Sequence, residues 1–231
     1  MARGFVKASS QSLTPVGLSD LTSQMSFGCL FSPGSTVGEA SFNTLLSKGA
    51  SGTDRNYGFD YRGISGVEKL EVYWTQPAST YVEHSATVVL SNSVFISIVW
   101  TIDWTTNPDT VTLYVDGVSQ SLELLGSNNS SPTTAATQAA RIGAFSTGAD
   151  FLDGSLAELF VTSDIVSASE AASLAKRFSP DLVLRRHAFD CYFPLIGNNS
   201  PETDPLTGKT ATLNNAPAKA AHPRIIKARH H

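Results

Sequence analysis

A succession of short segments in which apolar and polar residues alternate constrains the fold of this chain more than any other feature. The clearest is segment 94–103, VFISIVWTID, in which one face is wholly apolar: Val94, Ile96, Ile98 and Trp100. A period of two is the pattern of a strand with one buried face. Further strand-like segments lie at 26–31, 42–48, 57–61, 70–74, 86–90, 111–115, 119–125, 141–145, 154–162 and about 189–195. This many short strands separated by turn residues predicts an all-β protein built as an antiparallel sandwich.

Two local signals indicate where the chain turns and where a helix begins. Asp116-Gly117 predicts a two-residue β-hairpin, because a type I′ turn needs positive φ at both central positions. Ser167 followed by Glu170 fits a capping box, so a helix should start there and end before Pro180. The sequence therefore predicts one short helix, late in an otherwise β chain.

The composition fits this fold and limits its size. With 231 residues, of which 41% are hydrophobic, the chain can bury one sizeable core and is short for two full domains. Charged residues make up only 16%, and the 30 Ser and 22 Thr outnumber them, which suits polar sheet faces and turns. The apolar content is too high for a disordered chain.

The net charge of −4 conceals a division along the chain. Residues 1–175 hold 7 basic and 16 acidic residues, whereas residues 176–231 hold 9 basic and 4 acidic ones. Chance and turn chemistry can produce such a step, or the basic segment can dock on an acidic surface such as a neighbouring subunit. We predict an N-terminal arm (1–19), a β-sandwich (20–196) and a basic C-terminal extension (197–231).

The two cysteines, Cys29 and Cys191, do not make a disulfide-dense scaffold, and no CxxC motif offers a zinc or redox site. We expect two small buried core residues, with a disulfide between them as the alternative. The first ten residues lack the apolar core of a signal peptide. The longest apolar run is far short of the ~20 residues of a membrane helix. We therefore expect a soluble protein without membrane contact.

The order of several short motifs resembles the laminin-G-like branch of the concanavalin A-like lectin/glucanase superfamily. The matching pieces are LLSKG (45–49), NYGFDY (56–61), KLEVYW (69–74), VTLYVDG (111–117), RIGAF (141–145) and FLDGSLAELFVTSDIVSASEAASL (151–174). The resemblance covers about residues 20–180. It implies a two-sheet antiparallel jelly roll of about a dozen strands, and it says little about a ligand.

The stretch 189–225, which contains YFPLIGNNSPETDPLTG and then HP, resembles tail segments of laminin-G-like proteins of tailed bacteriophages. This resemblance implies a non-catalytic virion structural protein that decorates the head or belongs to the tail or fibre apparatus. Such a protein is assembled in the host cytoplasm and resides in the virion. Its implied partners are other virion proteins and copies of itself in a symmetric oligomer.

Motifs for catalysis are missing from the sequence. Retaining glucanases of the superfamily carry carboxylates in an ExDxxE spacing, and the nearest runs, around Glu68–Glu71 and Asp150–Glu158, have other spacings. No GxSxG motif, Walker A motif or dinucleotide fingerprint occurs. The resemblance places Glu158 at an acidic family position for which we expect a structural role, with hydrogen bonds to nearby backbone. We predict that the protein is not an enzyme.

Calcium is a common cofactor of the family, and three residues offer suitable oxygen ligands at alternating spacing: Asp54, Asn56 and Asp60. Asp and Asn in a loop are usually turn residues. We therefore predict no cofactor and keep calcium as the alternative.

A carbohydrate-binding site would need exposed aromatic rings to stack on sugars and polar side chains for their hydroxyls. The candidates are Arg55, Tyr57, Tyr61, Trp74, Tyr81 and Trp104. Aromatic residues on strands are mostly core or cross-strand pairs, and Trp100 is expected in the core. Trp104, at a polar turn after its strand, is the best candidate for exposure. A module that attaches to host-surface or extracellular glycans is the alternative function.

Basic residues late in the chain are the candidates for an assembly anchor: Arg185, Arg186, Lys219, Arg224, Lys227 and Arg229. They are scattered and poorly interleaved with aromatic residues, which argues against nucleic-acid binding. We expect them to hold the domain in the virion by salt bridges and strand addition, while the sandwich faces outward.

Overall fold

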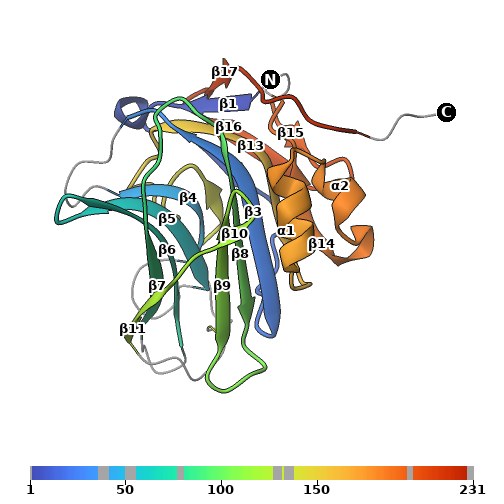
Figure 1. Cartoon of the computed structure of the whole chain (residues 1–231). Helices are drawn as coiled ribbons and strands as arrows, with labels where there is room; N and C mark the ends of the chain where they lie inside the picture. The colour runs from blue at the N-terminus through green and yellow to red at the C-terminus, as the bar shows by residue number, and fades with distance from the viewer. Residues whose placement is uncertain are drawn as a thin grey trace.

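The computed structural model describes residues 2–35, 42–49, 56–76, 81–126, 132, 138–196 and 200–227. The strands form two antiparallel sheets that face each other (Figure 1). The eight-stranded sheet has the order β10 (Val118–Ser119), β9 (Thr110–Val115), β8 (Ile96–Asp103), β3 (Gln24–Pro33), β13 (Gly154–Thr162), β1 (Ala2–Phe5) and β17 (Ala218–Ala220), and β14 (Phe189–Phe193) also pairs with β13.

The nine-stranded sheet has the order β11 (Glu123–Gly126), β7 (Tyr81–Val88), β6 (Val67–Thr75), β5 (Tyr57–Ile64), β4 (Phe42–Lys48), β12 (Arg141–Ile142), β2 (Ser12–Pro15), β16 (Thr210–Asn214) and β15 (Glu202–Thr203). The helices are α1 (Ala168–Ala175), α2 (Pro180–Val183) and the 3-10 turns η1 (Lys7–Ser9) and η2 (Arg186–Ala188). The predicted two-sheet antiparallel jelly-roll sandwich is confirmed, with α2 as a four-residue addition to the one predicted helix.

The core lies between the two sheets and is closed by aromatic pairs. Phe27 of β3 stacks on Phe59 of β5, with 4.3 Å between ring centroids, and Phe31 meets the Tyr61 ring edge-on at 5.4 Å. Trp100 is fully buried, as the alternation in β8 predicts. Because successive strand residues point to opposite faces, the inward aromatics of β5 place Asp60 on the outer face of its sheet.

The predicted hairpin is present, but the strand that follows it is divided between the two sheets. Asp116 and Gly117 have φ values of 47° and 78°, as a type I′ turn requires. β10 pairs with β9 for only two residues, and β11 then pairs with β7 of the other sheet. The single returning strand expected at 119–125 is therefore wrong, because the chain crosses from one sheet to the other at this point.

The helix α1 covers the outer face of the eight-stranded sheet (Figure 1). Its capping box is as predicted: the Glu170 backbone N–H donates to Ser167 Oγ at 3.3 Å, and the Ser167 N–H donates to Glu170 Oε2 at 2.7 Å. Ala171 and Leu174 face the sheet and are buried. A Cβ at Gly117 would lie 2.8 Å from the backbone of α1, so the hairpin glycine also allows the helix to approach closely.

Both ends of the chain contribute strands to the sheets, within the segments predicted as an N-terminal arm (1–19) and a basic C-terminal extension (197–231). β1 pairs with β13 and β17, and β2 pairs with β12 and β16. Arg3 Nε donates to Glu202 Oε1 at 2.9 Å, and Arg3 Nη1 donates to the Pro217 carbonyl at 2.8 Å, all within buried surroundings. These strands are short and polar, so their partners become apparent only when the two ends of the chain meet.

The two cysteines are free and buried, which confirms the prediction of two core thiols rather than a disulfide. Burial raises the pKa of both the Cys29 and the Cys191 thiol well above its ordinary value. Within the described ranges, no helix has the length and apolar character to cross a bilayer.

Candidate functional site

Three carboxylates gather on the outer face of the nine-stranded sheet, and we call them the carboxylate face: Asp60 on β5, Glu71 on β6 and Glu83 on β7. The strand register places Asp60 opposite Glu71, and Glu71 opposite Ser85, so Glu83 lies diagonally beside Glu71. Asp60 is 3%, Glu71 0% and Glu83 4% exposed. Asp and Glu side chains are rarely buried this deeply unless they are paired with other groups.

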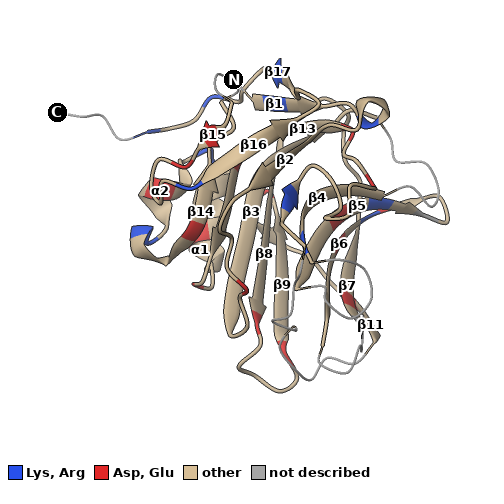
Figure 2. Ribbon diagram, turned by 180° about the vertical axis from the view of Figure 1, so that it is seen from behind, with Lys and Arg blue, Asp and Glu red and all other residues tan. Residues whose placement is uncertain are grey.

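A basic and more accessible rim adjoins the carboxylate face. Arg62, two residues beyond Asp60 on β5, donates from Nη1 to Glu71 Oε2 at 3.1 Å. Its guanidinium also lies 4.3 Å from the centre of the Phe42 ring. Lys69 Nζ lies 2.6 Å from Glu123 Oε2 of the edge strand β11. The Arg62 side chain is 24% exposed and the Glu123 side chain 64%, so this rim reaches solvent. Figure 2 shows acidic and basic residues together on this part of the sheet.

Burial is the main reason that the pKa of Glu71 rises from 4.5 to about 7. The charges of Glu83 and Asp60 act in the same direction, while the Arg62 guanidinium opposes them. A carboxyl group with this pKa is available in both protonation states near neutral pH. It can therefore either donate or accept a hydrogen bond.

Two hydroxyl groups flank the carboxylates in the same cross-strand row. Thr44 of β4 lies opposite Asp60, and Ser85 of β7 lies opposite Glu71. Both residues are fully buried, and neither hydroxyl has a hydrogen-bond partner in the part of the chain that the structure describes. The same holds for Arg62 Nε. Because buried polar groups are normally hydrogen-bonded, this row has unused capacity to bind a polar ligand.

The row and the adjoining Arg62 together offer hydrogen-bond acceptors, a cationic donor and hydroxyls that can both donate and accept. Carboxylates accept, the Arg62 Nε–H donates, and the Thr44 and Ser85 hydroxyls can do either. Hydroxyl-rich molecules need this mixture. No three His, Cys, Asp or Glu side chains converge as metal ligands among the described residues.

Comparison with known protein families places the fold. The family model of the concanavalin A-like lectin/glucanases superfamily matches residues 7–172. The chain belongs to this superfamily. No curated protein sequence matches the chain.

Solved structures share the lectin-like fold at low sequence identity. A Bacteroides ovatus protein assigned to carbohydrate binding superposes with a TM-score of 0.65 and 17% identity over 92% of this chain and 57% of its own length. CBM40 of the Ruminococcus gnavus IT-sialidase, bound to α2,3-sialyllactose, superposes with a TM-score of 0.55 and 14% identity, over 76% of this chain and 98% of its own length. The enzymatically active domain of tailspike protein 2 from bacteriophage CBA120 superposes with a TM-score of 0.55 and 12% identity, over 81% of this chain and 29% of its own length. This chain thus spans little more than half of the Bacteroides protein, and the identities show the fold alone.

In this lectin-like fold, the aromatic candidates for sugar stacking are mostly core residues. Tyr57, Tyr61 and Trp74 are fully buried, and Trp104 is only 6% exposed. The Trp74 ring stacks on His84 and meets the Trp104 ring edge-on, with centroids 5.6 Å apart in both pairs. The predicted exposure of Trp104 is wrong, because its backbone N–H bonds to the Ser23 carbonyl and its ring then closes the core. These four rings have no free face on which a sugar can stack.

The remaining candidates for sugar binding are Tyr81 and Arg55. Tyr81 is the first residue of β7. Arg55 lies outside the described residues, as does Asp54 of the predicted calcium set. Of that set, Asn56 is fully buried beside β5 and Asp60 belongs to the carboxylate face. Asp60 thus lies on β5 in the middle of the nine-stranded sheet, within the strand predicted at 57–61.

The described anchor candidates are exposed, as an attachment surface requires: Arg185, Arg186, Lys219, Arg224 and Lys227. Arg185 and Arg186 make surface ion pairs with Asp164 at 3.7 Å and Asp181 at 3.3 Å. Arg229 lies outside the described residues.

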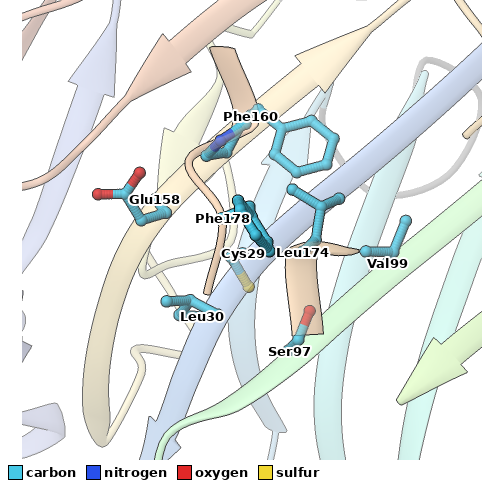
Figure 3. Close-up of a pocket in the computed structure, with 9 residues that line it drawn as sticks. Cys29, Leu30, Ser97, Val99, Glu158, Phe160, Leu174 and Phe178 are labelled. Atoms are coloured by element: carbon cyan, nitrogen blue, oxygen red, sulfur yellow. The ribbon is translucent and has the colours of Figure 1, made fainter. Parts of the chain in front are cut away.

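A small pocket between α1 and the eight-stranded sheet is a packing defect rather than a ligand site. It encloses about 10 Å³, which is room for one water molecule at most. Figure 3 shows Phe160, Phe178 and Leu174 together, with the Glu158 carboxylate pointing away from them. Glu158 receives a hydrogen bond from the Tyr192 hydroxyl and lies 3.2 Å from His222 Nε2. Its contacts are structural, as expected, but they are to side chains rather than to backbone.

Sequence reasoning missed the carboxylate face, although the signal is present. In KLEVYW, the inward residues Leu70, Val72 and Trp74 leave Glu71 outward, in the middle of a sheet. A search for the ExDxxE spacing looks along one strand, whereas these carboxylates come from three adjacent strands. Only the register between the strands brings them together.

Proposed function

We propose that this chain is a non-catalytic carbohydrate-binding module and that the ligand occupies the outer face of the nine-stranded sheet. The observation that carries this proposal is the buried row of Thr44, Asp60, Glu71 and Ser85, with hydroxyls that lack partners in the described protein. A sugar supplies the donors and acceptors that this row needs.

The location of the row supports recognition of a ligand. Its surroundings have low water access, so each hydrogen bond to a ligand is stronger than at an open surface. Arg62 and Glu123 form a partly exposed rim beside the buried groups. The Bacteroides ovatus protein and the CBM40 domain, which share this fold, are described with carbohydrate binding and bound sialyllactose.

The arrangement favours binding over hydrolysis. Glu71, the carboxyl group with a raised pKa, forms an ion pair with the Arg62 guanidinium. A general acid must give its proton to the oxygen of the leaving group, and the charge of Arg62 opposes protonation of Glu71. Incubation of bound oligosaccharides with the protein should leave them intact. Release of shorter fragments, lost in Glu71→Gln, would contradict the non-catalytic assignment.

A glycan array followed by calorimetry tests the binding proposal. We expect binding by the full chain and a loss of at least about tenfold in affinity for Glu83→Gln, which keeps the side-chain shape and removes one charge from the carboxylate face. Asp164→Asn, a surface carboxylate paired with Arg185 away from this face, is the matched control and should bind like the unmodified protein. Equal losses in both variants, or no binding to any glycan, would refute the site.

A second proposal, compatible with the first, is that the module is part of a bacteriophage virion, in the head, tail or fibre apparatus. The favouring observation is that the phage-like C-terminal segment completes both sheets while Lys219, Arg224 and Lys227 remain exposed. The similarity in fold to a phage tailspike protein agrees with it. In this setting the exposed cations contact acidic surfaces of other virion proteins or of further copies of the chain.

Deletion of the extension would not test attachment, because β16 and β17 are parts of the sheets. Charge reversal is the better test: Lys219→Glu, Arg224→Glu and Lys227→Glu together should leave the fold intact and abolish co-sedimentation with virions. Unchanged incorporation, or a monodisperse monomer that never accompanies virions, would contradict the virion proposal.

A further inference from the structure

The unused hydrogen-bonding groups of the row define the chemistry of the ligand beyond the general class of sugars. Arg62 Nε–H can only donate, so it needs a ligand acceptor. Thr44 Oγ1 and Ser85 Oγ can each donate to a ligand and accept from it. An uncharged hydroxyl group suits both kinds of group, because it accepts from Arg62 Nε–H and exchanges either role with Thr44 and Ser85.

An acidic group on the ligand would meet only part of this set. A carboxylate or sulfate supplies acceptors for Arg62, but it would lie beside Asp60, Glu71 and Glu83 in surroundings with little water. Like charges within a few ångströms repel strongly where water is excluded. The Arg62 guanidinium is already engaged by Glu71 through Nη1, which limits what it can offer an anion.

The length of the row sets a minimum size for the ligand. Thr44 and Ser85 lie on β4 and β7, separated by three strand spacings. At about 4.8 Å per spacing the two hydroxyls are about 14 Å apart. A single sugar ring is too short to reach both.

We infer that the site takes a neutral oligosaccharide, reads its hydroxyl groups through Thr44, Arg62 and Ser85, and rejects the same sugar when it carries an acidic group. This inference rests on the proposed function and specifies its ligand. It separates this chain from a domain of the same fold whose bound ligand is the acidic sugar sialyllactose.

The first test uses an array in which each neutral oligosaccharide is printed beside its sialylated, sulfated and uronate-bearing derivatives and its monosaccharide units. We expect neutral oligosaccharides to bind, their acidic derivatives to bind at least about tenfold more weakly, and monosaccharides to bind more weakly than oligomers. Equal or tighter binding of the acidic derivatives overturns the inference and leaves the proposed function standing. Failure to bind any glycan refutes the proposed function and the inference with it.

The second test separates a ligand-binding hydroxyl from a structural one. Ser85→Ala and Thr44→Val remove hydroxyls that bond to nothing in the described protein, so we expect affinity to fall about tenfold with no loss of thermal stability. Ser26→Ala is the matched control: Ser26 is equally buried in the other sheet, donates to the Asp164 carbonyl at 2.8 Å and accepts from the Val166 N–H at 3.0 Å. This control should lose stability and keep its affinity. If Ser85→Ala and Thr44→Val lose stability and retain affinity, the inference is wrong.

Discussion

The two outer faces of the sandwich are built from the same kind of antiparallel strand, yet they bury opposite chemistry. On the eight-stranded sheet, Val99 and Phe160 pack beneath Leu174 of α1 in a continuous apolar cluster. On the nine-stranded sheet, the corresponding outward positions of β5 and β6 are Asp60 and Glu71. Both faces are shielded from water, but only the first gains free energy directly from that shielding.

The difference indicates how the molecule divides stability from recognition. Between α1 and the sheet beneath it, the apolar packing leaves space for about one water molecule. On the polar face, the pKa of Glu71 is raised and the hydroxyls of Thr44 and Ser85 have no partner among the residues that the structure describes, and both features lower stability in the absence of a ligand. Polar groups that lower the stability of the fold in this way are expected where they serve binding.

The largest loss of stability should come from removing a buried ring from the apolar face. Phe160→Ala removes a ring that is 2% exposed, and we expect a loss of about 3–5 kcal/mol in the free energy of unfolding, measured by chemical denaturation. Phe178→Ala, whose ring is 37% exposed, should cost far less. Glycan affinity of the folded fraction should be unchanged in both. A Phe160→Ala variant with unaltered stability would contradict the stabilising role of this face.

The next effect concerns the pH dependence of stability at the polar face. Because the pKa of Glu71 is higher in the folded state, its contribution to stability is complete below about pH 4.5 and is lost as the pH rises through 7. The shift corresponds to at most about 3 kcal/mol. Relative to Glu71→Gln, the unmodified protein should therefore lose stability between pH 5 and pH 8, as measured by denaturation at each pH.

Because both proteins contain the other titrating groups, the contributions of those groups to the pH dependence cancel in this comparison. Burial raises the pKa of Asp109 to about 6, with the charge of Asp103 adding to the effect, and this change is common to both proteins. Glu123→Gln, on the exposed rim beside the row, is the control and should follow the unmodified protein. If Glu71→Gln shows the same pH dependence as the unmodified protein, Glu71 does not titrate as the structure indicates.

The smallest effect lies at the helix that covers the apolar face. Ser167→Ala removes the N-cap hydroxyl of α1 and should cost about 1 kcal/mol of unfolding free energy. Affinity for glycans should not change, because α1 lies on the opposite outer face. Weaker binding in this variant would mean that the two faces are coupled.

Local features were predictable because their physical causes are local. The positive φ values at Asp116-Gly117 and the capping box at Ser167 depend on neighbouring residues only. The inward face of β8 follows from alternation, and the fold class follows from the number and order of such segments. Each of these is encoded within about ten residues.

The remaining features depend on contacts between distant segments. The pairing of β1 with β17 joins the two ends of the chain, and neither strand has an apolar pattern of its own. Trp104 follows a polar turn, yet its ring packs on Trp74 from the other sheet. The carboxylate face exists only through the register of β5, β6 and β7. The sequence contains each residue of the site, but only the fold brings them together.

The most direct test of the division between the two faces is an amide ¹H–¹⁵N NMR titration of the full chain with a neutral oligosaccharide identified on the array. The structure predicts the largest shift changes at residues 60–62, 69–71 and 83–85, with little change in α1 and β13. Changes centred on α1 and β13, or spread evenly over both sheets, would contradict the assignment of recognition to the polar face.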